Sequence, residues 1–335
     1  MTRTRHLLAA QAFVFAGSAA LRARRGGGSV PLRLAEPVFR RAFRTAWSRY
    51  GNDLDGIRMF LDRTAAAGAV LARPARGCVI SDGGLAGGST REYTPATAVP
   101  GRTVLYLHGG GFVMYSPRAY DGFLSRLAGV LQARIIVPDY RLAPEHPFPA
   151  GVDDCFTAYE ALIADGQAPA QLLVAGESAG ANATLVTMQR ARAAGLPMPA
   201  GAVLMSGGFD ATWASPSITN NLDLDVVTGP HALAFLEEHF LSGLDRADPR
   251  VSPMYGTFAG LPPLLFQAGS TEVLVDDSVR AAERARAAAV VVRLEVFPHA
   301  PHAWHQLGTW LPETRKALEQ IEDFARVACG WTASS

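Results

Sequence analysis

A serine stands where a buried strand meets a helix, in a pattern suited to nucleophilic catalysis. The apolar run 171–175 leads directly into Gly-Glu-Ser-Ala-Gly at 176–180, and a helical pattern follows. In this strand–turn–helix setting, G-x-S-x-G forms a sharp turn that exposes the serine hydroxyl at the carboxyl edge of a sheet. The flanking glycines let neighbouring backbone approach without a Cβ clash. Ser178 is therefore the candidate nucleophile.

A glycine-rich loop one strand–helix set earlier could stabilise an oxyanion. The sequence His-Gly-Gly-Gly-Phe at 108–112 immediately follows the apolar run 104–107. Attack on an acyl group builds negative charge on the carbonyl oxygen, and each backbone N–H aimed at that oxygen stabilises it by about 3–4 kcal/mol. We expect the N–H groups of Gly109, Gly110 and Ala179 to form this oxyanion hole.

A serine nucleophile needs a general base, and three histidines compete for that role in one loop. His299, His302 and His305 all follow the last apolar strand pattern, and the residues alone do not choose among them. Their i, i+3, i+6 spacing could also gather them around a metal ion. Pro301 would interrupt a helix there, however, and no carboxylate lies close in sequence, so we expect no metal site.

The base in turn needs an acid that orients it, and candidates occur at two places, one in the loop after a strand and one about a helical turn later. The acid should follow the strand that precedes the histidine loop, at 264–267. Glu272 falls in the loop directly after that strand. Asp276 and Asp277 come about one helical turn later, where they could simply cap the next helix. On this reasoning both positions stay open.

A parallel sheet is needed to bring these loops together. After Pro100, short apolar runs alternate with helical stretches, which indicates an α/β fold with a mostly parallel central sheet and helices on both faces. We expect strands at 104–107, 134–137, 171–175, 202–205, 264–267 and 291–296. Helical patterns fit about 119–132, 151–165, 180–195, 276–288 and 312–328.

Three segments depart from this alternation. Residues 31–71 show a helical pattern. Residues 77–81 and 91–94 flank a glycine-rich turn and predict an antiparallel strand pair. Between 207 and 261 the pattern breaks into turns and one helix, around 230–241, which indicates an insertion over the sheet.

Composition disfavours several other classes of function. The 335 residues carry 31 basic and 30 acidic side chains, and a net charge of +1 gives no electrostatic reason to expect nucleic acid as a partner. Lys316 is the only lysine, so the chain lacks the lysine of a P-loop. Cys78, Cys155 and Cys329 lie far apart and favour neither a disulfide framework nor a redox or metal site.

Residues 1–28 form a separate N-terminal extension in the sequence. Two arginines precede an apolar run over 7–16, and small residues follow, which resembles a signal peptide. The run is short for a membrane span, and the arginines directly after it are unfavourable for export. The alternative is an amphipathic helix, docked on the body or anchored at a membrane interface. We expect a cytoplasmic protein; secretion, or membrane contact through residues 7–21, is the alternative.

Together with a third block, these motifs resemble the hormone-sensitive-lipase-like family of α/β-hydrolases, the group with an HGGG-type oxyanion loop. The blocks are residues 108–112, 139–150 (Asp-Tyr-Arg-Leu-Ala-Pro-Glu-His-Pro-Phe-Pro-Ala) and 176–180. The similarity covers roughly residues 75–328. The resemblance implies the α/β-hydrolase fold. It also implies that the middle block braces the oxyanion turn and the nucleophile through buried hydrogen bonds.

The family pattern also chooses between the competing residues. It places the acid on Glu272 rather than Asp276, and the base on His302, which has an aromatic residue two positions later. The resulting chain order of serine, acid and histidine is that of α/β-hydrolases. The chain departs from the family pattern in two places. The acid of relatives is commonly Asp, and the residue before the nucleophile, here Glu177, is often Asp or Thr, which leaves the subgroup open.

The resemblance further implies a helical cap over the active site. Its parts would be N-terminal helices within 29–75 and an insertion at about 208–255, with the hydrolase core over 76–330. Such caps line an apolar pocket for the acyl or alcohol group of a substrate. The candidate lining residues are Phe112, Met114, Tyr115, Phe209 and Trp213.

These features predict a serine carboxylic-ester hydrolase that forms an acyl-enzyme, with Ser178, His302 and Glu272 as its catalytic residues. The expected substrate is a small-molecule ester with a short to medium acyl chain, and the mechanism requires no cofactor or metal. An amidase or deacetylase with the same residues is one alternative, and a non-catalytic binding protein on the same scaffold is another. The oligomeric state stays open, a homodimer being one option.

Overall fold

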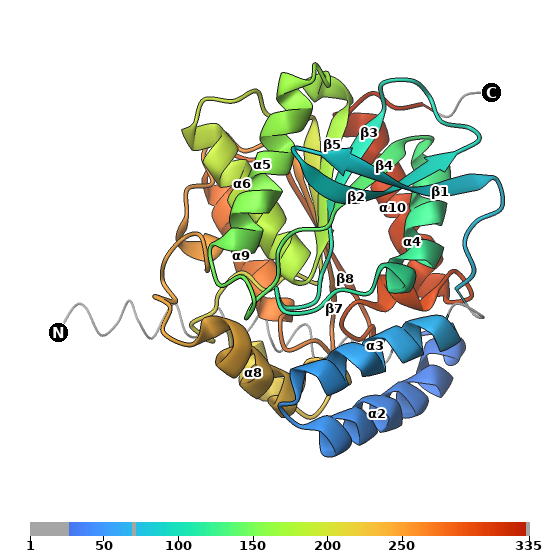
Figure 1. Ribbon diagram of the computed structural model, residues 1–335, viewed down its shortest axis with the longest axis vertical. Coiled ribbons are helices and arrows are strands. Elements are labelled where there is room, and N and C mark those ends of the chain that lie inside the picture. The colour runs from blue at the N-terminus through green and yellow to red at the C-terminus, as the bar shows by residue number, and fades with distance from the viewer. Residues whose placement is uncertain (1–26, 69–71, 333–335) are drawn as a thin grey trace.

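One eight-stranded sheet forms the centre of the protein. The computed structural model describes residues 27–68 and 72–332, so the predictions for residues 1–26 lie outside the described residues. The strands are β1 Cys78–Leu85, β2 Gly88–Pro95, β3 Thr103–Leu107, β4 Arg134–Pro138, β5 Leu172–Glu177, β6 Gly201–Met205, β7 Leu264–Gly269 and β8 Val292–Phe297. Their order in the sheet is β1-β2-β4-β3-β5-β6-β7-β8 (Figure 1). β2 pairs antiparallel with β1 and β4, and the other pairs are parallel, which confirms the predicted sheet.

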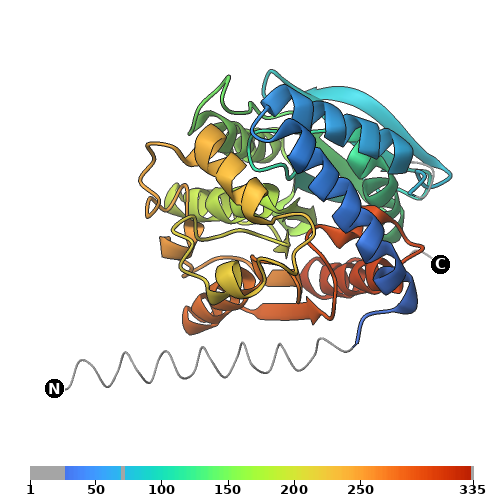
Figure 2. The ribbon, with the colours of Figure 1, turned by 90° about the horizontal axis from the view of Figure 1, so that it is seen from below.

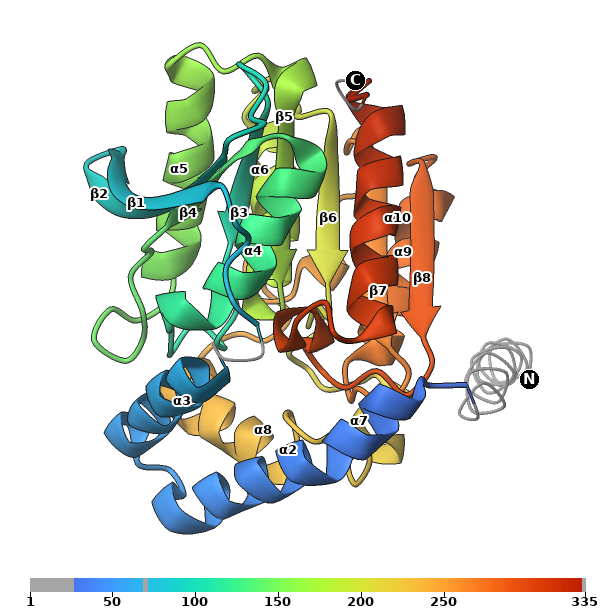
Figure 3. The same ribbon diagram turned by 90° about the vertical axis from the view of Figure 1, so that its right-hand side faces the viewer.

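Helices cover both faces of this sheet (Figure 3). α4 Pro117–Leu131 and α10 Pro312–Ala328 pack on one face, and α5 Ala150–Ala164, α6 Ala179–Ala193 and α9 Val275–Ala287 pack on the other. Successive residues of a strand point to opposite faces. In β3, Val104 and Tyr106 therefore join the core beneath α4 and α10, whereas Leu105 and Leu107 join the core on the other side. Burial on both faces explains why β3 is apolar at nearly every position.

The strands and helices predicted after Pro100 are confirmed with boundaries that shift by at most two residues, whereas β1 and β2 extend three to four residues further toward their turn than the predicted strand pair. Among the parallel strands, the largest differences are at β5 and β7, which extend two residues beyond the predicted ends. The reason is backbone pairing: Gly176 still pairs with Leu204 of β6, and Gly269 still pairs with Phe297 of β8. Both strands thus run up to the loops that carry the candidate site residues.

Four more helices lie beyond the carboxyl ends of the strands (Figures 2 and 3). They are α2 Val30–Tyr50, α3 Leu54–Gly68, α7 Pro216–Asn220 and α8 Pro230–Leu236. We call these helices, with the segment that joins α7 to α8, the cap. The helix predicted over 230–241 is confirmed, as α8 and one π-helical turn that continues it to Leu241, but the expectation of only one helix in the insertion is wrong because α7 is a second. In the described part of the chain, we find no helix whose length and apolarity would suffice to span a membrane.

The cap rests directly on the glycine-rich loop through a small apolar cluster. Ile57 of α3 and Phe235 of α8 are buried together with Val113 and Ala143, which lie just after that loop and in the 139–150 block. Trp47 of α2 packs edge to face on Phe235, with ring centroids 5.5 Å apart. Burial of side chains of this size stabilises the contact by roughly 1.5–3 kcal/mol each. The cap therefore holds the loop that carries the candidate oxyanion donors.

Candidate active site

Ser178 occupies a sharp turn between β5 and α6. Its backbone has φ 55°, a left-handed conformation that costs a non-glycine residue about 1–3 kcal/mol. The N–H of Ser178 donates to the carbonyl of Met205 at 2.8 Å, which pins the turn to the end of β6. At Gly180 an added Cβ would stand 1.9 Å from the carbonyl oxygen of Leu107, so only glycine fits there. The sequence pattern thus follows from how closely the turn approaches β3.

Three side chains from three loops meet at the carboxyl edge of the sheet. Ser178 Oγ lies 2.8 Å from Nε2 of His302, and Nδ1 of His302 lies 3.0 Å from Oε2 of Glu272. Glu272 follows β7, and His302 follows β8. Because the carboxyl ends of parallel strands share one edge, residues far apart in the sequence become neighbours here. The arrangement can pass a proton from the hydroxyl to an imidazole whose far nitrogen is held by a carboxylate.

The other two histidines of the loop have different contacts. His305 is fully buried beneath α10, its Nε2 lies 3.1 Å from Oε1 of Gln267, and burial lowers its pKa to about 3. His299 is half-buried, and its backbone N–H donates to the hydroxyl of Ser270. Among the described residues, we find no cluster of three or more histidine, cysteine or acidic side chains placed to bind a metal ion.

Glu272 is completely buried, and its carboxylate is held by several donors. Oε1 accepts the hydroxyl of Ser206 at 2.9 Å and the backbone N–H of Gly269, while Oε2 faces His302. A buried carboxylate without such partners would be strongly disfavoured. These bonds fix the direction of the carboxylate, and through it the orientation of the imidazole.

Asp276 and Asp277 have a different task, since they tether the cap insertion to α9. Asp277 accepts the N–H groups of Phe209 and Asp210, at 2.8 and 2.9 Å. Asp276 accepts the N–H of Ser217 at 2.9 Å. Both carboxylates are thus bound to the segment that follows β6, and of the competing acids it is Glu272 that contacts His302.

Two residues of the insertion hold the acid loop, and the sequence reasoning did not identify them. Asn221 donates from its side-chain amide to the carbonyl oxygen of Glu272 at 2.7 Å. Asp225 accepts the backbone N–H of Val273 at 2.9 Å. No motif marks either residue, because the contacts join segments about fifty positions apart. Only the packed structure reveals that the cap also supports the acid.

The structure changes one of the three predicted oxyanion donors. The N–H of Gly109 donates to the hydroxyl of Tyr120 at 2.8 Å, and that hydroxyl in turn donates to Oε2 of Glu177 at 3.1 Å. The Gly109 amide is therefore engaged with Tyr120 of α4. Within residues 27–68 and 72–332, the amides of Gly110 and Gly111 donate to no protein acceptor. The expectation for Gly109 is wrong in this conformation.

His108 anchors the same loop from beneath. Its ring is stacked between Tyr115 and Tyr140, with centroids 3.7 and 3.9 Å away, and burial lowers its pKa to about 3. The hydroxyl of Tyr140 donates to the carbonyl of His108 at 2.7 Å. In the same block, the N–H of Ala143 donates to the carbonyl of Phe112 at 2.8 Å. The predicted bracing of the oxyanion turn by residues 139–150 is confirmed, and Tyr115 supports this turn instead of lining a pocket.

The remaining pocket candidates separate into core and cap residues. Phe209 has no exposed surface and packs edge to face on Phe266 in the core, so its expected place in a pocket wall is wrong. Met114 packs on the cluster that joins the cap to the loop. Trp213 is half-buried in the insertion. These observations do not place Met114 or Trp213 in a substrate pocket.

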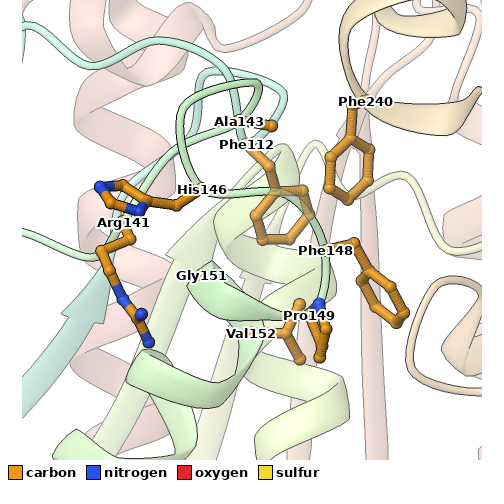
Figure 4. A pocket seen from close by; sticks show the side chains of 9 residues that line it. All are labelled: Phe112, Arg141, Ala143, His146, Phe148, Pro149, Gly151, Val152 and Phe240. Carbon is orange, nitrogen blue, oxygen red and sulfur yellow. The ribbon is translucent and has the colours of Figure 1, made fainter.

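Phe112 does line a pocket, at the junction of the glycine-rich loop, the 139–150 block and the cap (Figure 4). Its ring stacks on Phe240, with centroids 4.8 Å apart, and Phe148 lies beside them. The lining residues are Phe112, Arg141, Ala143, His146, Phe148, Pro149, Gly151, Val152 and Phe240. These described residues do not include Ser178, so the serine hydroxyl does not line this pocket.

Glu177 places a second carboxylate beside the imidazole. It is 2% exposed, and its Oε1 lies 3.6 Å from Nε2 of His302. Burial lowers the pKa of His302, but the hydrogen bond and charge of Glu272, with the charge of Glu177, outweigh it and raise that pKa to about 9. Two buried carboxylates therefore stabilise the positive charge that the His302 imidazole gains whenever it takes up a proton.

Comparisons with known proteins place this geometry in context. A family model described as alpha/beta hydrolase fold matches residues 104–306. An acetyl-hydrolase of Streptomyces hygroscopicus is 36% identical over 284 residues, which cover 85% of this chain and 93% of the relative. An esterase from the bacterial hormone-sensitive lipase family aligns with TM-score 0.83 and 31% identity over 90% of this chain and 99% of that one. A structure named EstE5-PMSF aligns with TM-score 0.75 and 34% identity over 83% and 91%.

The carboxylates beside His302 lead to a first prediction. Replacing Glu177 by Gln keeps its size and removes its charge, so the pKa of His302 should be lower in this variant than in the wild type. Glu272→Gln should lower it further, since Glu272 also holds a hydrogen bond to the ring. Histidine-selective NMR titration measures both shifts. Asp62→Asn removes an exposed carboxylate on α3 and serves as the control, which should leave the pKa of His302 unchanged. If Glu177→Gln also left that pKa unchanged, the role given to Glu177 would be contradicted.

Proposed function

The chain belongs to the hormone-sensitive-lipase-like group of α/β-hydrolases and is an esterase-like hydrolase, and from this premise we propose that it cleaves carboxylic esters through a covalent acyl-Ser178 intermediate. The observation that carries the proposal is the continuous contact from Ser178 Oγ to His302 at 2.8 Å, and from His302 to Glu272 at 3.0 Å. The similar structure named EstE5-PMSF supports the same nucleophile here, because PMSF is a sulfonyl fluoride that reacts with activated serines.

In the proposed first step, Ser178 Oγ attacks the ester carbonyl carbon while Nε2 of His302 takes the hydroxyl proton. The carbonyl oxygen becomes an oxyanion. When the carbon–oxygen bond to the alcohol breaks, the imidazolium gives its proton to the departing alcohol. Water then attacks the acyl-enzyme, with His302 again removing a proton, and the carboxylic acid leaves as Ser178 recovers its own. Glu272 keeps the imidazole in the required tautomer and stabilises its positive charge.

The oxyanion would be held by backbone N–H groups on both sides of the nucleophile. We assign Ala179, at the first turn of α6, and Gly110 of the glycine-rich loop. Gly111 takes the third place instead of Gly109, because the Gly109 amide is already bonded to Tyr120. Such donors act best when they are fixed before the reaction begins. The stacking of His108 and the contacts of Tyr140 supply that rigidity.

The proposed substrate is a small-molecule ester with a short to medium acyl chain. The similar Streptomyces hygroscopicus protein is an acetyl-hydrolase, which supports the short end of this range. No metal or cofactor takes part in the proposed steps.

Removing the nucleophile should abolish activity without unfolding the protein. Ser178→Ala should lower kcat/KM for p-nitrophenyl butyrate by on the order of 10⁴-fold or more. Its thermal unfolding midpoint should stay close to that of the wild type, because the hydroxyl makes one partly buried contact. Activity within about tenfold of the wild type would rule out Ser178 as the nucleophile.

The two competing acids can be separated by matched amide substitutions. Glu272→Gln should reduce kcat by about 10³–10⁴-fold, since the imidazole loses both its charge partner and its preferred tautomer. Asp276→Asn keeps an acceptor for the N–H of Ser217 and should cost less than about tenfold. Steady-state kinetics on the same ester measure both. The reverse ranking would transfer the role of the acid to Asp276.

A series of acyl chains tests the substrate class. With p-nitrophenyl acetate, butyrate, octanoate and palmitate, kcat/KM should be greatest for acetate or butyrate and should fall steeply toward palmitate. A matched anilide, p-nitroacetanilide, should be hydrolysed far more slowly than the acetate ester. A maximum at palmitate would contradict the proposed chain length, and faster cleavage of the anilide would favour an amidase.

A further inference from the structure

The positive charge of this nearly neutral chain is concentrated at one end. The first 50 residues contain ten arginines and a single acidic residue, Glu36, which gives them a net charge of +9. Since the whole chain carries +1, the other 285 residues carry −8. Five of these arginines lie on α2, the outermost helix of the cap. Such an uneven charge distribution orients a protein as it approaches an anionic partner, so that its positively charged side faces that partner.

One side of α2 holds the helix on the protein. Leu32 is buried with Phe297 and Trp304 of the core. Phe43 packs edge to face on Phe60 of α3. On the same helix, Arg40 donates to the carbonyl oxygens of Asp223 and Leu224 and pairs with Glu36. The sole acidic residue of the helix is thus neutralised within this anchored side.

The other side of α2 exposes apolar and basic side chains together. Val30, Leu34 and Val38 follow each other at intervals of four and are 69%, 72% and 67% exposed. Arg41 and Arg44 extend the same stripe toward the C-terminal end and are also exposed. We call these five residues the outer α2 face. Three large aliphatic side chains exposed in a row are unusual on a helix that otherwise packs well.

A shallow hollow at the basic end adds to this surface. It is lined by Pro37, Arg40, Arg41, Arg44, Thr45, Ser48 and Arg49. Guanidinium and hydroxyl groups are suited to phosphodiesters, because both donate hydrogen bonds to phosphate oxygens. The apolar residues stand beside these donors on the same side of the helix. A phospholipid presents the same two features, an anionic phosphate next to apolar chains.

The outer α2 face lies at the same end of the protein as the candidate active site. Figure 3 shows α2 on the outer side of the cap, in the direction in which the strands point their carboxyl ends. In the sequence, residues 1–26 contain the other five arginines.

We propose that the outer α2 face docks the protein on an anionic phospholipid membrane. Val30, Leu34 and Val38 enter the boundary between headgroups and acyl chains, while Arg41 and Arg44 bind lipid phosphates, as in helices that lie in the plane of an interface. Docking in this orientation turns the cap toward the lipid. The proposal does not depend on the nucleophile, because it concerns binding alone.

Vesicle co-sedimentation of the full chain tests the proposal. The protein should bind phosphatidylcholine vesicles that contain about one third phosphatidylglycerol, should bind pure phosphatidylcholine poorly, and should be released as salt rises. Arg41→Glu/Arg44→Glu should weaken binding to the anionic vesicles by at least about tenfold. Leu34→Ser/Val38→Ser should also weaken it, with less sensitivity to salt. All variants retain residues 1–26, so any loss reports on α2.

Matched variants elsewhere on the protein provide the controls. Arg286→Glu/Arg326→Glu makes the same change in net charge on α9 and α10, and Val291→Ser/Val327→Ser removes side chains that are 72% and 78% exposed. Both should bind as the wild type does, and circular dichroism should show every variant folded. Wild-type binding by Arg41→Glu/Arg44→Glu would overturn the proposal, as would equal losses in the controls. Self-association that depends on the outer α2 face, without vesicle binding, would overturn it in favour of a second copy of the chain.

Discussion

The arrangement of the whole site depends on keeping a charged carboxylate, Glu272, entirely away from water. A buried carboxylate is tolerated only when hydrogen bonds and an opposite charge replace its hydration. Here Ser206, Gly269 and His302 supply them, and each comes from the end of a different strand or the loop after it. The parallel sheet is the device that places these loop ends side by side. The cap completes the enclosure, since Asn221 and Asp225 hold the backbone of the acid loop.

The second carboxylate, Glu177, gives the site a character that a simple serine–histidine–acid arrangement would lack. It lies before the nucleophile, is buried, and is held by Tyr120 and Gln306. Because the Tyr120 hydroxyl also accepts from Gly109, one chain of hydrogen bonds joins the oxyanion loop, α4 and the residue beside the proposed nucleophile. The loop and the nucleophile turn are thus set by the same contacts. A substitution at any residue of this hydrogen-bond network should therefore alter the hydrogen bonds of the other residues in it.

The sequence was most informative where the backbone itself is constrained. The apolar runs predicted the strands because they are buried on both faces, and the glycines of 176–180 predicted the turn because a side chain at Gly180 would collide with β3. It was least informative where a partner comes from a distant segment. Gly109 has the right residue type for an oxyanion donor, but Tyr120 of α4 occupies its amide. Phe209 and Tyr115 are aromatic near the site, yet packing assigns them to the core and to His108. Asn221 and Asp225 belong to no motif, and only tertiary contacts reveal them.

The central claim is that Ser178 becomes covalently acylated, and an activity-based label tests it most directly. A fluorophosphonate reacts with an activated serine and leaves a stable adduct that resembles the tetrahedral intermediate. Peptide mapping by mass spectrometry after complete inhibition should find one adduct per chain, on the peptide that contains Ser178. Labelling should become much slower in His302→Ala, which lacks the proposed base. An adduct on another residue, or full ester hydrolysis by protein whose Ser178 is labelled, would contradict the account.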